Sequence, residues 1–104
     1  MKRTNWAFPG ASAVFVTAVA ASQPPLATTR SAEALSFNCF TCHGPEGSGA
    51  GSMPALRGRS AEELLDRLRQ FRQGAGEPTI MDRIARGYTD EELARIAAYI
   101  AGLP

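Results

Sequence analysis

The stretch Cys39-Phe40-Thr41-Cys42-His43 holds both cysteines and the only histidine of this 104-residue chain. Two cysteines and one histidine leave a tetrahedral zinc site one ligand short. A redox-active C-x-x-C dithiol would need the strand and helix pattern of a thioredoxin-like domain, which the sequence does not predict. A disulfide between such close cysteines would close a loop too small to stabilise a fold. The remaining interpretation is C-x-x-C-H, the pattern typical of covalent haem c attachment.

The spacing within this stretch has a chemical reason. Cysteines three positions apart, on a turn that leads into a helix, can reach both vinyl groups on one edge of a porphyrin. The histidine that follows then lies under the ring, where its imidazole can bind the iron. A covalently held haem also adds apolar area to the core, which so small a domain lacks. The sequence therefore predicts one haem c, attached through Cys39 and Cys42, with His43 as an axial ligand.

A second axial ligand must come from another residue type, because the chain has one histidine, and methionine is a known alternative. Met53 follows His43 closely and is expected on the histidine side of the ring. Met81 leaves enough chain to reach the opposite face, so we predict Met81 as the ligand. Ligation on both faces closes the iron, which indicates an electron carrier. A peroxide- or ligand-reactive haem enzyme would need an open position and would bind cyanide or carbon monoxide readily.

The segments around the cysteine stretch predict an all-α domain of three to four short helices. Capping-box sequences at 60–63 and 89–92 each mark the start of a helix. Apolar residues at helical spacing follow both boxes: Leu64, Leu65, Leu68 and Phe71 after the first, Leu93, Ile96, Ala97 and Ile100 after the second. A first helix is expected from Ser31 into the cysteine stretch, and another within 79–86. The glycine-rich stretch 44–53 is expected to be a loop.

Residues 1–21 have the parts of an export signal, with a positively charged start and an apolar, small-residue run. Cleavage is expected after Ala20 or Ala21. The run is shorter than the about 20 residues that a membrane-spanning helix needs, so no membrane span is expected in the mature chain. The predicted organisation is a signal peptide at 1–21, an irregular leader at 22–31 and a single haem-carrying domain at 32–104. In a bacterium the mature protein would be periplasmic.

Charge excludes one class of partner and leaves some arginines open. The signal carries Lys2 and Arg3 of the 11 basic residues, whereas all 10 acidic residues lie beyond it. The near-neutral mature chain has no polybasic surface for nucleic acid, and its lack of lysine disfavours a carrier steered by a lysine ring. Arg57 and Arg59 either pair with haem propionates or are solvated loop residues. Three further arginines are expected on a solvated helix face: Arg67, Arg69 and Arg72.

The attachment motif is followed by a proline-bearing loop, a later methionine and a final helix that contains an aromatic residue. Together these make residues 32–103 resemble class I c-type cytochromes. The resemblance implies that the first and last helices cross near one edge of the haem. The residues expected to meet there are Leu35 and Phe37 with Leu93, Ile96 and Tyr99.

The same resemblance implies a role for Pro54. Its carbonyl oxygen would accept the Nδ1 hydrogen of His43 and fix the orientation of the ring; otherwise Pro54 is an ordinary loop proline. Tyr88 would either pack in the core or face a partner, and core packing is expected.

A narrower resemblance rests on Phe-Arg-Gln-Gly at 71–74, Glu-Pro-Thr-Ile-Met at 77–81 and the stretch 83–92. These segments look like the haem subunit of flavocytochrome c sulfide dehydrogenase, although Arg59 stands where glutamine is expected. The resemblance implies an electron-accepting subunit that is no enzyme by itself, beside a flavoprotein subunit that carries FAD and oxidises sulfide. A downstream cytochrome would take the electrons. The alternative is a free, diffusible monohaem cytochrome c that carries electrons between respiratory complexes.

Overall fold

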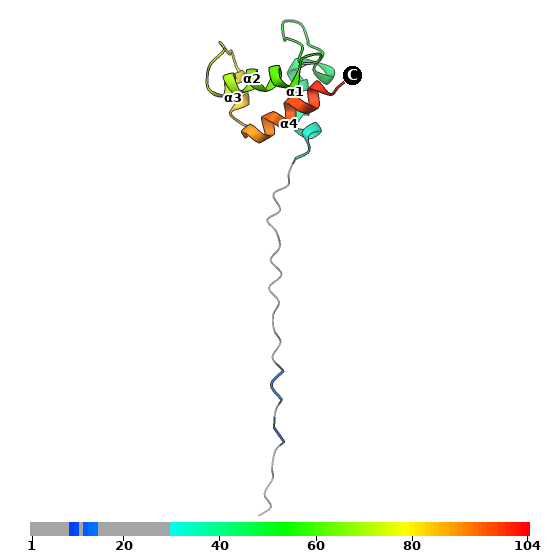
Figure 1. Ribbon diagram of the computed structural model, residues 1–104, viewed down its shortest axis with the longest axis vertical. Helices are drawn as coiled ribbons and strands as arrows, with labels where there is room; N and C mark the ends of the chain where they lie inside the picture. The colour runs from blue at the N-terminus through cyan, green and yellow to red at the C-terminus, as the bar shows by residue number, and fades with distance from the viewer. Residues whose placement is uncertain (1–8, 11, 15–29) are drawn as a thin grey trace, which may run out of the picture.

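The computed structural model describes residues 9–10, 12–14 and 30–104. The predicted signal peptide 1–21 and most of the predicted leader 22–31 lie outside the described residues. Over 30–104 the chain forms four α-helices and one 3-10 turn, with no strand (Figure 1). The predicted all-α fold is therefore confirmed. No helix in the described part of the chain is long and apolar enough to cross a membrane.

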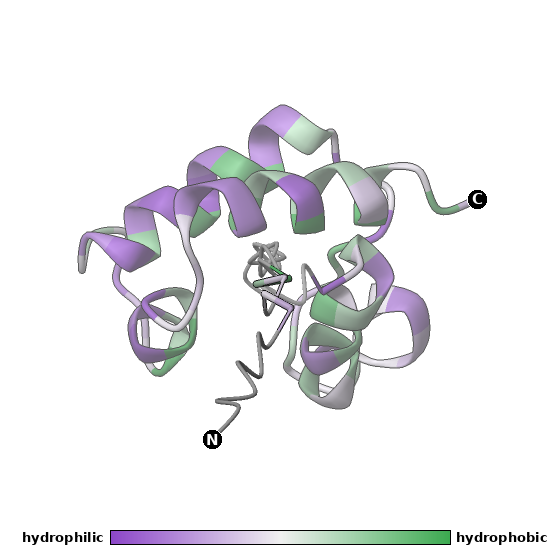
Figure 2. Ribbon diagram, turned by 90° about the horizontal axis from the view of Figure 1, so that it is seen from below, coloured by the Kyte–Doolittle hydropathy of each residue, from purple (hydrophilic) through white to green (hydrophobic). Residues whose placement is uncertain are grey.

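The elements follow the predicted order along the chain. They are α1 at Ala32–His43, η1 at Pro45–Gly47, α2 at Ala61–Arg72, α3 at Met81–Ala85 and α4 at Asp90–Ala101. Each of the three long helices is preceded by a residue with a hydroxyl group: Ser31, Ser60 and Thr89. That hydroxyl accepts a hydrogen bond from a backbone N–H in the first turn of its helix. Figure 2 shows hydrophilic and hydrophobic residues within each long helix. Along α2 and α4 the apolar residues recur at helical spacing, which places them on one face.

The two predicted capping boxes are both present. The side chain of Glu63 accepts from the backbone N–H of Ser60 at 3.0 Å, and Glu92 accepts from Thr89 at the same distance. In return, each hydroxyl accepts from the backbone N–H of its glutamate at 3.1 Å. Because these bonds favour the charged carboxylate, they lower the pKa of Glu63 and of Glu92.

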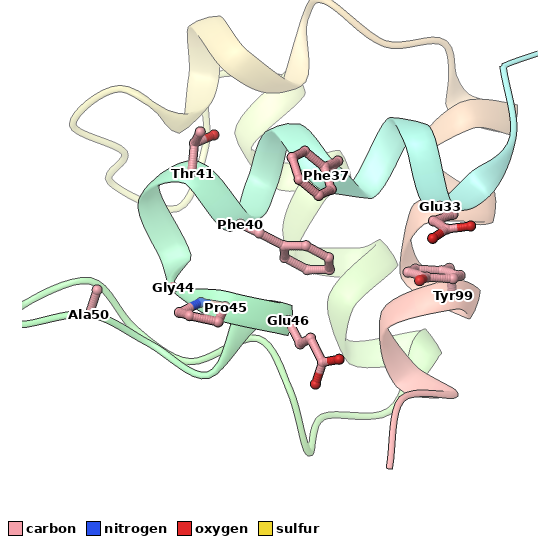
Figure 3. A pocket seen from close by; sticks show the side chains of 9 residues that line it. All are labelled: Glu33, Phe37, Phe40, Thr41, Gly44, Pro45, Glu46, Ala50 and Tyr99. Atoms are coloured by element: carbon pink, nitrogen blue, oxygen red, sulfur yellow. The ribbon is translucent and has the colours of Figure 1, made fainter.

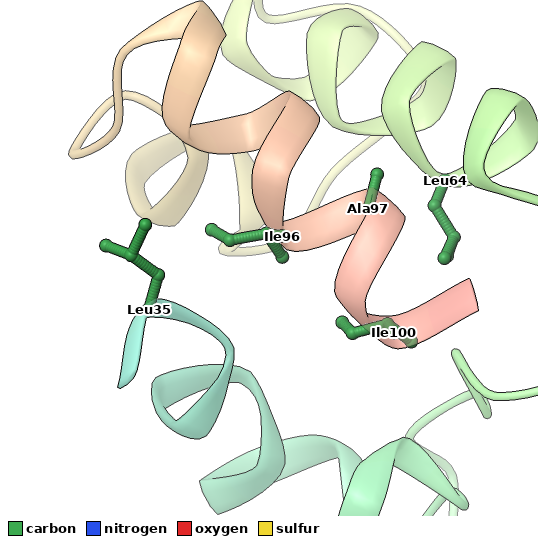
Figure 4. Packing of buried hydrophobic residues seen from close by; sticks show 5 residues of the cluster. All are labelled: Leu35, Leu64, Ile96, Ala97 and Ile100. Carbon is green, nitrogen blue, oxygen red and sulfur yellow. The ribbon is translucent and has the colours of Figure 1, made fainter. Parts of the chain in front are cut away.

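The core forms where α4 packs against both α1 and α2 (Figure 4). Its buried members are Leu35, Leu64, Ile96, Ala97 and Ile100. Leu35 from α1 is fully buried and Ile96 from α4 is 1% exposed. The predicted crossing of the first and last helices is therefore confirmed, and it holds in place the element that carries the cysteines.

Phe37 departs from the prediction that it would meet the last helix in this core. It is 68% exposed. The reason is helical geometry: positions two apart differ by about 200° around the axis, so Phe37 turns away when Leu35 faces α4. Its ring instead meets the edge of Phe40, with centroids 6.5 Å apart and an interplanar angle of 64°.

Four arginines, which we call the arginine cluster, gather around the C-terminal end of α2: Arg67, Arg69, Arg72 and Arg86. Arg69 holds Asp90, at the start of α4, through two hydrogen bonds of 2.8 and 2.7 Å. Hydrogen bonding and charge from Arg69 lower the pKa of Asp90. All four arginines are exposed, which confirms the predicted solvated face and adds a bond between α2 and α4.

Candidate haem site

Both cysteines lie in the last two turns of α1. Cys39 is half-buried, Cys42 is exposed, and both are free. Residues three positions apart share one face of a helix, so the two thiols lie on the same side of α1. Burial raises the pKa of the Cys39 thiol, which favours the neutral thiol over the thiolate.

His43, the last residue of α1, is 5% exposed. Its Nδ1 atom lies 2.7 Å from the carbonyl oxygen of Pro54. Because a carbonyl can only accept, Nδ1 carries the hydrogen and Nε2 keeps a free lone pair. Within the described residues, Nε2 is buried and has no hydrogen-bond partner. A buried nitrogen of this kind is costly unless something binds it, and an axial bond to haem iron would satisfy it. The residues present fit the group.

The loop after α1 is folded so that the Pro54 carbonyl faces His43. Gly44 ends the helix with a positive φ of 84°, and a Cβ at this position would collide with the carbonyl oxygen of Gly49. Gly49 in turn donates its backbone N–H to the His43 carbonyl at 2.6 Å. The predicted loop at 44–53 is therefore correct except for η1, and glycine directly after the helix is a recognisable stop signal.

Two further backbone contacts close this loop. Ala50 and Met53 exchange hydrogen bonds of 3.2 and 2.9 Å, and Leu56 donates to the Gly47 carbonyl at 2.8 Å. Pro54 lies between these two contacts. Its carbonyl oxygen is thus held by the main chain on both sides, as an acceptor that orients a ligating histidine should be.

The two loop arginines have partners within the protein. The guanidinium of Arg57 bonds Glu46 at 2.9 Å and also the carbonyl of Pro104. Arg59 donates to the carbonyl of Ala55 at 3.1 Å. Both arginines thus have partners within the protein, and their pairing with haem propionates stays a prediction. Glu46 adopts a left-handed conformation with φ 52°, and nothing in the local sequence marks it as the partner of Arg57.

Met81 lies apart from the cysteines and His43, as the first residue of α3. It is half-buried between Ile80, 52% exposed, and Ile84, 44% exposed. One side-chain bond joins α1 to the segment after α3: Asn38 donates to the hydroxyl of Tyr88 at 3.2 Å. Tyr88 packs against the core as predicted. No sequence pattern marks Asn38 as the partner of Tyr88, because asparagine is common at any exposed helix position.

Comparisons with known proteins agree with this site. The family model described as Cytochrome c matches residues 28–104. The chain is 36% identical over 91 residues to the cytochrome subunit of sulfide dehydrogenase from Chlorobaculum tepidum, which covers 86% of this chain and 83% of the relative. It is 33% identical over 108 residues to the thiosulfate dehydrogenase electron acceptor from Stutzerimonas stutzeri, covering 100% of this chain and 50% of that protein.

A solved structure gives the same result for the fold. Cytochrome c4 from Acidithiobacillus ferrooxidans superposes with a TM-score of 0.59 at 35% identity, covering 62% of this chain and 38% of the other. This chain therefore spans half or less of the Stutzerimonas protein and of the cytochrome c4 chain. The C-x-x-C-H motif at Cys39, Cys42 and His43 fits a family that carries covalent haem c. The chain belongs to the cytochrome c family and is an electron-transfer protein that is not catalytic by itself.

Proposed function

We propose that this chain is the electron-accepting cytochrome subunit of a sulfide-oxidising flavocytochrome c. The observation that carries the proposal is the similarity to the sulfide dehydrogenase cytochrome subunit, which extends over 86% of this chain. The resemblance of the segments 77–81 and 83–92 to that family supports the same assignment. Its partner would be a flavoprotein that carries FAD, and a downstream cytochrome would receive the electrons.

Four side chains would hold the cofactor. Cys39 and Cys42 would form the two thioether bonds, while His43 and Met81 would be the axial ligands. When bound, haem supplies a one-electron redox centre whose potential depends on its ligands and surroundings. The Pro54 carbonyl keeps the His43 hydrogen on Nδ1 and so presents the Nε2 lone pair. A thioether ligand from Met81 would favour the reduced iron and raise the potential.

Sulfide chemistry is assigned to the partner. Oxidising sulfide takes a flavin or reactive thiols, and both cysteines of this chain are used for attachment in the proposal. The imidazole of His43 is likewise committed on both nitrogens. This chain would therefore receive electrons and pass them on, with no bond to the sulfur substrate.

The proposed site of action is the periplasm. The support is the predicted signal peptide at 1–21, cleaved after Ala20 or Ala21, together with a C-x-x-C-H motif in the exported part. Export would bring the chain to the compartment where its flavoprotein partner is expected.

The test is an absorption spectrum of the protein purified gently from its own host, before and after sulfide is added. Flavin bands beside the haem bands, with prompt haem reduction by sulfide, are expected. The isolated cytochrome, separated from its partner, is the control and should be reduced only slowly. Haem alone in the native preparation, reduced equally slowly, would contradict the assignment and favour the free, diffusible carrier.

A further inference from the structure

A hollow opens beside α1, between this helix, η1 and α4 (Figure 3). The residues proposed to hold or orient the haem do not line this hollow: Cys39, Cys42, His43, Pro54 and Met81. Its walls include four apolar or aromatic side chains and two carboxylates: Phe37, Phe40, Pro45, Tyr99, Glu33 and Glu46. The hollow is therefore a second concave feature, next to the haem site and distinct from it.

The floor of the hollow is aromatic, and one ring is displayed to solvent. Phe37 is 68% exposed although it is among the largest apolar residues. It stands edge-on against Phe40, 6.5 Å between centroids, and Phe40 packs against the core. The core therefore holds the half-buried ring of Phe40, which in turn supports the exposed ring of Phe37. Rigid aromatic groups of this kind dominate protein interfaces, because they contribute area at a small entropic cost.

The charged side chains that line the hollow are both acidic. Glu33 and Glu46 stand at its rim, and no arginine lines it. The described part 30–104 contains no lysine. Glu33 forms no ion pair within the described residues, whereas Glu46 is ion-paired with Arg57 at 2.9 Å and its side chain stays 59% exposed. The arginine cluster lies elsewhere, around the end of α2. An occupant that complements this rim carries positive charge around an apolar centre.

The hollow also adjoins the attachment stretch. Thr41 and Gly44 line it, and these residues flank Cys42 and His43 in the sequence. A protein seated in the hollow would therefore touch the chain on both sides of the exposed cysteine and the buried histidine. The hollow therefore lies beside residues that would hold the cofactor.

We propose that this hollow is the docking site for the protein that exchanges electrons with this cytochrome. The partner presents an apolar side chain to Phe37 and Phe40, flanked by arginine or lysine that faces Glu33 and Glu46. The identity of that partner as a flavoprotein rests on the proposed function, whereas the docking face rests on the hollow itself.

The first test is photo-crosslinking in the native host with the full chain. Phe37→p-benzoylphenylalanine should crosslink to a redox protein, at a peptide that contains arginine or lysine. Adding Glu33→Arg should abolish this product, and Glu62→Arg should not. The two glutamates are matched, because each is exposed and is the second residue of its helix. Glu62 does not line the hollow.

The second test uses the partner protein that the crosslink identifies, purified without any crosslink. The rate at which this partner reduces the haem is measured for each variant. Phe37→Ser and Glu33→Arg should slow reduction about tenfold at low ionic strength, and Glu33→Arg should weaken its salt dependence. Glu62→Arg should match the wild type. Reduction by ascorbate, which needs no docking face, should be the same for all chains.

The outcomes separate the two proposals. A crosslink only to residues 22–29 of this chain or to a second copy would overturn the docking site, as would no crosslink at all. A redox partner without flavin that depends on Glu33 would keep the docking site and overturn the sulfide dehydrogenase assignment. A flavoprotein that reduces every variant equally fast would keep the sulfide dehydrogenase assignment and overturn the docking site.

Discussion

The Nδ1 atom of His43 lies 2.7 Å from the carbonyl oxygen of Pro54, and the Nε2 atom across the same ring is buried without a partner in the described part of the chain. A single hydrogen bond thus sets both the tautomer and the direction of the free lone pair. The backbone around Gly44 and the pair formed by Ala50 and Met53 hold the acceptor in place. The properties of the proposed ligand should therefore respond to this loop.

Replacing Pro54 by alanine keeps the carbonyl oxygen and frees the backbone that carries it. The free energy of unfolding should fall by up to about 1 kcal/mol. A looser bond to Nδ1 makes the imidazole a weaker electron donor, so the reduction potential should rise. Denaturant unfolding and a redox titration of the holoprotein measure both. Pro45→Ala is the control, since its carbonyl accepts from Ser48 rather than from His43; equal potential shifts in the two variants would contradict the role of Pro54.

Replacing Met81 by alanine should leave one coordination position of the haem iron free. The variant should bind cyanide and carbon monoxide readily, and its reduction potential should fall because the thioether ligand is lost. Met53→Leu is the matched control and should keep a closed iron, because Met53 lies in the loop next to Pro54. Ligand binding followed by absorption spectroscopy decides between them. If the Met53 variant bound cyanide and carbon monoxide readily and the Met81 variant did not, the ligand would be Met53 and not Met81.

Leu35 and Phe37 should differ sharply on truncation although they are two residues apart on one helix. Leu35→Ala removes a fully buried side chain from the contact with α4, and should cost about 3 kcal/mol. Phe37→Ala removes a ring that is 68% exposed, and should cost less than about 0.5 kcal/mol. Denaturant unfolding of both holoproteins measures the difference. Similar losses would place Phe37 in the core.

Acid should weaken the fold through the two capping boxes. Hydrogen bonds from Ser60 and Thr89 lower the pKa of Glu63 and of Glu92 in the folded chain. A carboxylate with a depressed folded pKa stabilises the fold above its unfolded pKa, about 4.3 for glutamate, and that contribution is lost as the pH falls through the folded pKa. Urea unfolding between neutral and acid pH should show this decline. The double variant with Glu63→Gln and Glu92→Gln should flatten it, and an unchanged slope would rule out this cause.

Local chemistry made much of this fold predictable. The capping boxes mark the starts of α2 and α4, because four adjacent residues carry the whole signal. The C-x-x-C-H stretch likewise needs only its own five residues. The direction of Phe37 was not predictable in this way, since apolar side chains lie all around α1 and no periodicity selects the buried face.

Contacts between residues far apart in the sequence could not be predicted, for a different reason. The bond from Asn38 to Tyr88 joins residues that are 50 positions apart, and Arg57 reaches both Glu46 and Pro104. Such pairs depend on how the helices cross, which is set by the buried cluster around Ile96. The bond from His43 to Pro54 was expected only because the sequence resembles a known family.

The placement of charge has a consequence for how the molecule meets a partner. Carboxylates stand at the rim of the hollow, and arginines gather around the end of α2. Ion pairs neutralise Glu46 and Arg69, so the charges that remain separated are Glu33 at the hollow and Arg67, Arg72 and Arg86 at the end of α2. Their separation gives the domain an electric dipole. In the field of a charged protein it experiences a torque before any contact is made, so it arrives already turned. Salt at physiological strength confines that alignment to roughly the last 8 Å of approach.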